Sequence, residues 1–226
     1  MSKRNKRNNN VDHRPQIDFA PKTQTQSELF QDLESNDLMV VLGPAGTGKT
    51  YTTCVKAAQW LVRGAVKKIV LARANVATGK SLGAIPGNLD EKLAPWTMPM
   101  TEVLREHLGS TMFEYCTNKG KIQTVALETI RGRSFRDTFI IVDECQQLTL
   151  DEIKAISTRV GEGSTIVFMG DPKQSDLRGQ SGISTFMNLL VNYNPPNTSI
   201  IQFDLDDIVR SDTCANMVRM FHEAGY

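Results

Sequence analysis

The sequence predicts an α/β domain with a mostly parallel sheet and helices on both of its faces. Six short apolar runs alternate along the chain with segments of helical length. Continuous apolar runs are typical of strands buried on both faces, as in parallel sheets. Polar motifs directly follow three of these runs, at residues 43–50, 143–147 and 170–174. The motifs should therefore meet at the carboxyl edge of the sheet, where such folds bind ligands.

The expected elements follow one another in regular order. Residues 21–37 fit a loop and a short amphipathic helix, 38–43 fit the first strand, and 50–64 fit a helix that stops at a glycine. Further strands are expected at 67–73, 122–127, 138–143, 164–170 and 198–205. Further helices are expected at 100–108, 150–161, 181–192 and 211–225.

The chain divides into an arm and one domain. Residues 1–16 are predicted to be a basic, disordered arm, since the first 14 residues carry five Lys or Arg and one Asp. Such an arm either contacts a phosphate backbone or is simply a solvated tail. Residues 17–226 are predicted to form the domain, with a proline-containing helical insertion at about 82–118.

Composition excludes several classes of protein. Hydrophobic residues make up 40% of the 226, as in folded domains. No apolar run approaches the roughly 20 residues that span a bilayer, and no signal core begins the chain. We therefore expect a cytoplasmic protein with no membrane partner. The four cysteines are far apart and form no C-x-x-C pair, which favours buried free thiols over a zinc site or disulfides.

A phosphate-binding loop follows the first strand. Residues 43–50, GPAGTGKT, match G-x-x-x-x-G-K-[ST] between a strand and a helix. Backbone N–H groups of such a loop cradle phosphate oxygens, Lys49 adds a positive charge, and the Thr50 hydroxyl binds Mg²⁺. The sequence thus predicts a P-loop NTPase. The predicted nucleotide contacts in this loop are Gly43, Pro44, Ala45, Gly46, Thr47, Gly48, Lys49, Thr50 and Tyr51.

Two adjacent acids end the strand FIIVD. We expect Asp143 to hold Mg²⁺ through water and Glu144 to orient or deprotonate an attacking water. An acid in the base position favours hydrolysis over transfer to a small acceptor. The alternative is a helix-capping Asp followed by a surface Glu.

A candidate phosphate sensor follows the strand that ends at residue 170. Gln174, with Asp171, is placed to sense whether the γ-phosphate is present and to couple its loss to backbone movement. Asp171 followed by Pro172 is also a common start of a turn. An arginine should stabilise the transferring phosphoryl group, and spacing does not choose among the candidates. These are Arg73, Arg131, Arg133, Arg178 and Arg210.

With these motifs the chain resembles the PhoH family of ATPases, which are related to the nucleotide-binding half of superfamily 1 helicases. The resemblance covers about residues 20–224. It is carried by KTQTQ, GPAGTGKT, IVLAR, SLGAIPGNLDEKLAPW, ETIRGRSF, FIIVDECQQ, TRVGEGSTIVFMGDPKQSDL and DIVRSD. It implies a RecA-like sheet with bound ATP and Mg²⁺.

The resemblance also implies three residue roles. Gln26 matches the glutamine that reads adenine, with one donor and one acceptor for the base edge. Gln146 and Arg210 match positions that contact the γ-phosphate.

The chain departs from the family pattern at three positions. It has Ala74 where the family usually has Pro, and Cys145 and Gln147 where the family has Ala and Asn. Cys145 is expected to pack as a small apolar residue. No role is assigned to Gln147.

The predicted function is that of an ATPase acting on single-stranded RNA or DNA as a helicase-like motor. One RecA-like domain supplies one side of an ATP site, so a homo-oligomer, with a hexameric ring suspected, would supply the other. The roughly 36 residues before the first strand are too few for an extra domain, as in minimal bacteriophage forms, which act in the host cytoplasm. The loop at 79–86 either lines a pore or packs. The alternatives are a nucleotide-gated binding protein with a slow ATPase and a small-molecule kinase.

Overall fold

The computed structural model describes residues 17–74, 89–130, 132–175 and 181–224. The basic arm, the loop at 79–86, the first part of the insertion, Arg131 and Arg178 lie outside these ranges.

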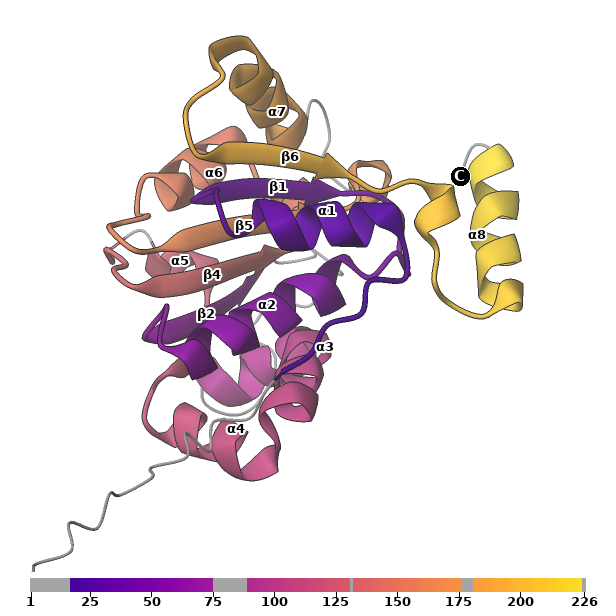
Figure 1. The fold of residues 1–226 in the computed structure, drawn as a ribbon. Helices are drawn as coiled ribbons and strands as arrows, with labels where there is room; N and C mark the ends of the chain where they lie inside the picture. Colours follow the sequence, from indigo (N-terminus) through magenta and orange to yellow (C-terminus); the bar gives the residue numbers. More distant parts are fainter. Residues whose placement is uncertain (1–16, 75–88, 131, 176–180, 225–226) are drawn as a thin grey trace, which may run out of the picture.

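Six parallel strands form one sheet in the order β3-β2-β4-β5-β1-β6 (Figure 1). Their bounds are β1 Leu38–Leu42, β2 Lys68–Arg73, β3 Ile122–Val125, β4 Thr138–Asp143, β5 Thr165–Gly170 and β6 Thr198–Gln202. The predicted parallel α/β class is therefore confirmed, together with the six strands that the apolar runs predicted.

Two strands end at least two residues earlier than the sequence indicated. The run at 122–127 stops at Val125 because Leu127 begins a short helix. The run at 198–205 stops at Gln202, since Asp204 caps a 3-10 turn by accepting a hydrogen bond from the Asp206 N–H.

The described helices are α1 Gln24–Asp32, α2 Lys49–Arg63, α3 Leu89–Leu108, α4 Ser110–Asn118, α5 Leu127–Ile130, α6 Leu150–Ser157, α7 Gly182–Tyr193 and α8 Asp212–Glu223. Helices α1 to α4 pack on one face of the sheet and α5 to α7 on the other. Three short 3-10 turns, η2 Cys145–Gln147, η3 Pro172–Gln174 and η4 Leu205–Asp207, follow β4, β5 and β6. Helices α3 and α4 form the described part of the predicted insertion.

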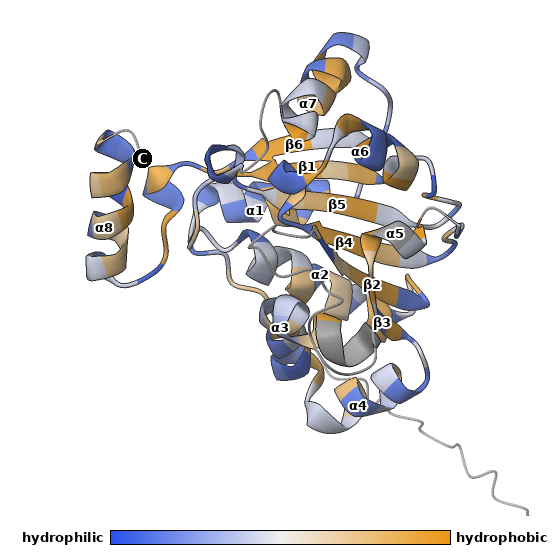
Figure 2. Cartoon of the chain, turned by 180° about the vertical axis from the view of Figure 1, so that it is seen from behind, coloured by the Kyte–Doolittle hydropathy of each residue, from blue (hydrophilic) through white to orange (hydrophobic). Residues whose placement is uncertain are grey.

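Side chains of each strand alternate between two cores. Met39 and Val41 of β1 pack with α1 to α4, whereas Val40 and Leu42 pack with α5 to α7. Figure 2 shows the strands as the most apolar layer of the molecule. Burying one Leu- or Phe-sized side chain contributes about 1.5–3 kcal/mol, so the two cores fix the sheet firmly.

Strand β5 lies between the P-loop strand β1 and the acid-bearing strand β4. Leu42 is level with Gly170 across β1 and β5, and Arg73 is level with Asp143 across β2 and β4. The segments that follow these strands therefore converge on one edge of the sheet.

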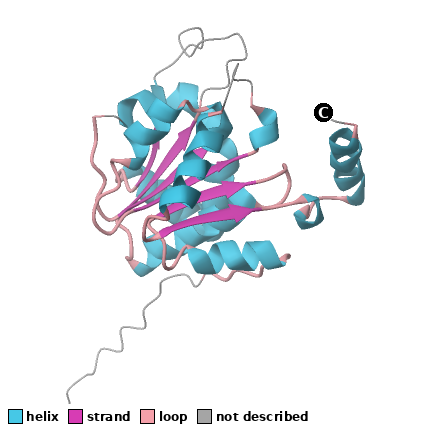
Figure 3. Cartoon of the chain, turned by 90° about the horizontal axis from the view of Figure 1, so that it is seen from above, coloured by secondary structure: helices cyan, strands magenta, loops and turns pink. Residues whose placement is uncertain are grey.

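Helix α8 stands apart from the rest of the domain (Figure 3). Ala215 is its one buried residue, and Met217, Met220 and Phe221 are exposed. None of the described helices has the length and apolar character needed to cross a membrane.

Candidate functional site

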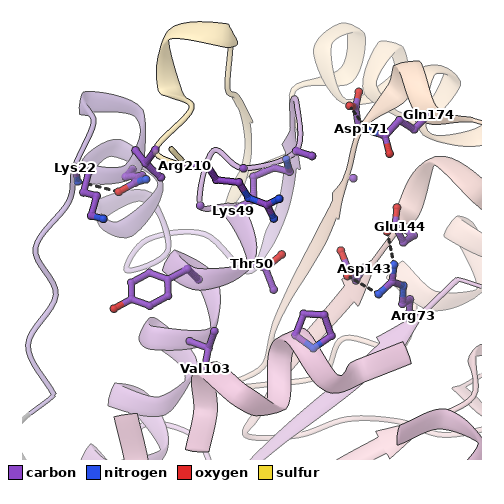
Figure 4. A pocket seen from close by; sticks show the side chains of 18 of the residues that line it. Lys22, Lys49, Thr50, Arg73, Val103, Asp143, Glu144, Asp171, Gln174 and Arg210 are labelled. Atoms are coloured by element: carbon purple, nitrogen blue, oxygen red, sulfur yellow. Dashed lines mark hydrogen bonds and ion pairs between the residues drawn. The ribbon is translucent and has the colours of Figure 1, made fainter. Parts of the chain in front are cut away.

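A cavity of about 610 Å³ opens at the carboxyl edge of the sheet. It is the meeting point of the P-loop, the ends of β2, β4 and β5, and one face of α3 (Figure 4). Its lining residues include Gln26, Ala45, Gly46, Gly48, Lys49, Thr50, Tyr51, Arg73, Asp143, Glu144, Asp171, Gln174 and Arg210. The three polar motifs singled out in the sequence thus share one site.

The P-loop curls through backbone conformations that favour glycine. Gly48 has φ +86°, and a Cβ atom there would lie 2.6 Å from Nε2 of Gln26. The Thr47 hydroxyl donates to the Pro44 carbonyl over 3.0 Å and closes the loop from behind. Helix α2 begins directly afterwards at Lys49, so the N-terminus of the helix points at the cavity.

Lys49 lies against the loop that precedes it. Its Nζ donates to the carbonyl oxygens of Gly43 and Pro44, both over 2.7 Å. Burial lowers the pKa of Lys49, and the nearby carboxylates of Asp171, Asp143 and Glu144 oppose this shift. The ammonium is thus held at the loop, where a phosphate group supplies stronger acceptors than a carbonyl does.

Both acids of the FIIVDE segment line the cavity. The backbone turns sharply after Asp143, because Glu144 adopts a left-handed conformation with φ +55°. Such a conformation is strained for a non-glycine residue and is common at functional sites. Burial raises the pKa of Asp143, although Arg73 opposes the shift.

Thr50 and Asp143 fit a magnesium ion that is shared with a nucleotide. Both side chains line the cavity, one from α2 and one from the end of β4. No cluster of three or more His, Cys, Asp or Glu suited to a metal occurs in the described part of the chain. Mg²⁺ is commonly held by one or two protein oxygens together with phosphates and water, and a hydroxyl with one carboxylate is a donor set of this kind.

The turn after β5 carries Asp171 and Gln174. Asp171 accepts hydrogen bonds from the Lys173 N–H over 3.1 Å and from Nε2 of Gln174 over 3.0 Å. Gln147, to which the sequence assigned no role, donates from Nε2 to the Gln174 carbonyl over 3.0 Å. The η2 and η3 turns are therefore linked, and Asp171 serves both the turn and the cavity wall.

The amide of Gln26 faces the P-loop from α1. Its Oε1 accepts from the Lys22 N–H over 2.9 Å, and its Nε2 donates to the Thr47 carbonyl over 3.0 Å. An amide can make one further hydrogen bond at each end beyond these two, although Gln26 is buried at the edge of the cavity.

Two of the candidate arginines line the cavity. The side chain of Arg210 lies over the P-loop, since a Cβ at Gly46 would come within 3.0 Å of its Cδ. Arg73 faces the acids from the end of β2. Arg133 instead donates to Gln123 over 3.4 Å and does not line the cavity.

Comparison with known proteins identifies the family. The family model described as "PhoH-like protein" matches residues 18–222. The chain belongs to the PhoH-like family.

Three relatives show the extent of the similarity within the PhoH-like family. The chain is 38% identical over 202 residues to the PhoH-like protein of Bacillus subtilis, which covers 88% of this chain and 63% of that protein. It is 34% identical to the PhoH-like protein of Mycobacterium tuberculosis strain H37Rv, over 88% of this chain and 57% of that protein. It is 32% identical to Protein PhoH of Escherichia coli K12, over 93% of this chain and 60% of that protein. The chain thus spans about 60% of the length of these relatives.

Solved structures resemble this PhoH-like chain more distantly. The Pif1 helicase of Candida albicans is 14% identical, with a TM-score of 0.41 over 82% of this chain and 40% of that one. The large terminase of a thermophilic bacteriophage is 12% identical, with a TM-score of 0.47 over 92% of this chain and 51% of that one.

Gln146 is placed differently from the expectation drawn from the PhoH resemblance. It is buried and does not line the cavity. Its Nε2 donates to Oε2 of Glu144 over 2.6 Å, and its Oε1 accepts from the Asp171 N–H over 3.2 Å. Because the η2 turn directs the amide beneath Glu144, this geometry does not support a direct contact with the γ-phosphate.

Other predicted residues of the PhoH motifs also lie behind the cavity. Gly43, Pro44 and Thr47 shape the loop without lining the opening. Cys145 is fully buried in the core that includes α6 and α7, as its predicted packing role requires. Burial raises the pKa of the Cys145 thiol well above its usual value, and Asp143 adds to the shift.

Four residues of the cavity wall were not predicted as site residues. Ala20 and Lys22 precede α1, and Lys22 opens the KTQTQ motif, whereas Pro99 and Val103 lie on α3. Tyr51, which was predicted, accompanies them at the cavity wall and makes a 3.1 Å hydrogen bond with His107 of α3. No local pattern marks the α3 residues, because only the packing of α3 on α2 brings them to the P-loop.

Proposed function

We propose that the chain hydrolyses ATP with Mg²⁺ and uses the energy to act on single-stranded nucleic acid, with RNA the first substrate to test. The observation that carries the proposal is the shared cavity. It combines a phosphate loop and its lysine, a hydroxyl and a carboxylate suited to Mg²⁺, and a second carboxylate suited to activating water.

The residue roles follow from this arrangement. Lys49 and the loop amides hold the phosphates, and Thr50 and Asp143 hold Mg²⁺. Glu144 orients or deprotonates the attacking water, while Gln174 and Arg210 respond to the γ-phosphate. Gln26 recognises the adenine and so selects ATP.

We also propose that the active form is a homo-oligomer, with a hexameric ring as the leading arrangement. A helicase-like motor needs two RecA-like surfaces around each ATP, and the described residues form one such sheet. The exposed apolar face of α8 offers a surface for contact with a second copy.

A second candidate function is a nucleotide-gated binding protein with slow hydrolysis and no unwinding. The observation in its favour is that Oε1 of Glu144 lies 2.5 Å from an arginine nitrogen, which occupies one oxygen of the proposed base.

ATP turnover measured with and without single-stranded RNA separates the two candidates. The motor predicts that a saturating unstructured RNA, or DNA of the same sequence, raises turnover at least several-fold. An equal rate with and without both nucleic acids, together with unchanged ATP affinity, would contradict the motor and leave the gated binding protein. A Lys49→Ala variant should show neither basal nor stimulated turnover.

A further inference from the structure

Arg73 ends β2 and reaches the acids of the neighbouring strand. It lies level with Asp143 in the parallel register, and its side chain is largely buried. Its Nη2 lies 2.5 Å from Oε1 of Glu144, and its Nη1 lies 3.9 Å from Oδ2 of Asp143. Figure 4 shows the guanidinium directed at these two carboxylates. Arg73 is therefore placed to act on the acids.

The same guanidinium is anchored to the helical insertion. Its Nη1 donates to the backbone carbonyl of Trp96 in α3 over 2.9 Å. Trp96 lies between Pro95 and Pro99, two prolines inside α3. Each proline lacks the N–H that would bond the preceding turn, so this part of α3 deforms more readily than an uninterrupted helix.

The other oxygen of Glu144 is held from the opposite side. Oε2 accepts a hydrogen bond from Nε2 of Gln146, whose Oε1 accepts from the Asp171 N–H at the end of β5. The Glu144 carboxylate is therefore held at both oxygens, although its backbone is in a strained conformation. A continuous chain of polar contacts runs from α3 through Arg73, Glu144 and Gln146 to β5.

We propose that Arg73 is a positioning residue that couples the helical insertion to Glu144. This inference rests on the proposed function, because it assigns Glu144 the role of catalytic base. A movement of α3 at Trp96 displaces Arg73, and Arg73 in turn changes the direction of the carboxylate. Gln146 passes the same displacement to the turn that carries Gln174. The insertion thereby sets the rate of ATP hydrolysis through Arg73, and Arg73 itself does not contact the nucleotide phosphates.

The kinetic test is a double-mutant cycle of Arg73→Gln and Glu144→Gln. Arg73→Gln should lower kcat about tenfold or more while KM for Mg²⁺·ATP stays within about twofold, because misplacing a catalytic group affects turnover. Adding Arg73→Gln to Glu144→Gln should cause no further loss, since Arg73 acts through that carboxylate. Arg105→Gln, in an exposed pair with Glu114 on the same insertion, is the matched control and should retain the wild-type rate.

A second readout does not depend on catalysis. The chain has two tryptophans, so Trp60→Phe leaves Trp96 as the single indole. In that background, Mg²⁺ with a non-hydrolysable ATP analogue should shift Trp96 fluorescence. The analogue should still bind after Arg73→Gln, and the shift should be lost.

Three results would overturn the inference. These are a wild-type kcat for Arg73→Gln, an additive loss in the double variant, and an unchanged Trp96 response without Arg73. If the unmodified chain hydrolyses no ATP, the proposed function fails, and the fluorescence comparison still decides whether Arg73 links α3 to the site.

Discussion

At the scale of single residues, the site places charged groups in surroundings that disfavour their charged forms. Lys49 and Asp143 are both partly buried, and this burial disfavours the charged form of each. Their mutual attraction opposes this cost. Bound Mg²⁺·ATP would stabilise both charged forms, because its phosphates attract the lysine and its cation attracts the aspartate.

The first prediction concerns the pH dependence of Mg²⁺ binding. Since the pKa of Asp143 is raised by burial, its carboxylate should take up a proton at a higher pH than an ordinary aspartate. As the pH falls, Mg²⁺-dependent affinity for ATP should therefore begin to weaken at a higher pH than protonation of an ordinary aspartate would produce. Titration calorimetry in matched buffers measures this. Asp143→Asn should remove the Mg²⁺-dependent part, and an equal pH dependence in that variant would contradict the assignment.

The second prediction concerns Arg210. Its side chain lies over Gly46 of its own P-loop, so it should act within its own chain. Arg210→Ala should leave ATP affinity nearly unchanged and lower kcat about 10²-fold or more, because the arginine stabilises developing charge.

Mixing the Arg210→Ala chain with the Lys49→Ala chain tests this placement. If Arg210 acts within its own chain, no site in the mixture is complete and turnover should not recover. Recovered turnover would show that the arginine serves a neighbouring subunit, because an Arg210→Ala site would then borrow the arginine of a Lys49→Ala neighbour.

At the scale of elements, the sequence predicted the strands better than the surroundings of the site. Apolar runs such as 138–143 are unambiguous because a strand covered on both faces excludes polar residues. The P-loop and the acids were predictable for the same reason, since each follows such a strand. Spacing could not reveal that Arg73 pairs with Glu144, because that contact depends on which strands are neighbours.

Other features depend on packing that no local pattern encodes. Helix α8 reads from its sequence as an ordinary amphipathic helix, yet its apolar face is exposed in the structure. Gln146 matched a phosphate-contacting position, but the η2 turn buries it beneath Glu144. In both cases the sequence indicated the helix or the motif, but it did not indicate the direction in which the side chains point.

The third prediction therefore concerns the exposed face of α8. Met217 and Phe221 are 46% and 54% exposed and lie one helical turn apart. If this face contacts a second copy, the pair Met217→Ser and Phe221→Ser should lower the native mass toward that of a monomer. Native mass spectrometry at matched concentrations, with and without Mg²⁺·ATP, measures this. Glu223→Gln, at the end of the same exposed helix, is the control.

An unchanged mass in the α8 double variant would contradict the proposed contact. Circular dichroism should show that the variant remains folded, because α8 contributes little to either core.

At the scale of the whole molecule, a parallel sheet brings three strand ends to one cavity. The order of the strands sets β5 between the P-loop strand and the acid strand, so the turn with Gln174 borders both. We propose that this cavity hydrolyses ATP with Glu144 as the base.

Phosphate release from Mg²⁺·ATP by the unmodified chain and by Glu144→Gln, measured together with ATP binding to both, tests this claim most directly. We expect turnover by the unmodified chain, and a loss of about 10²-fold or more in the variant with ATP affinity retained, since a lost general base typically costs about 10²–10⁴-fold. An undiminished rate in Glu144→Gln, or a loss of ATP binding equal to that of Lys49→Ala, would contradict the account.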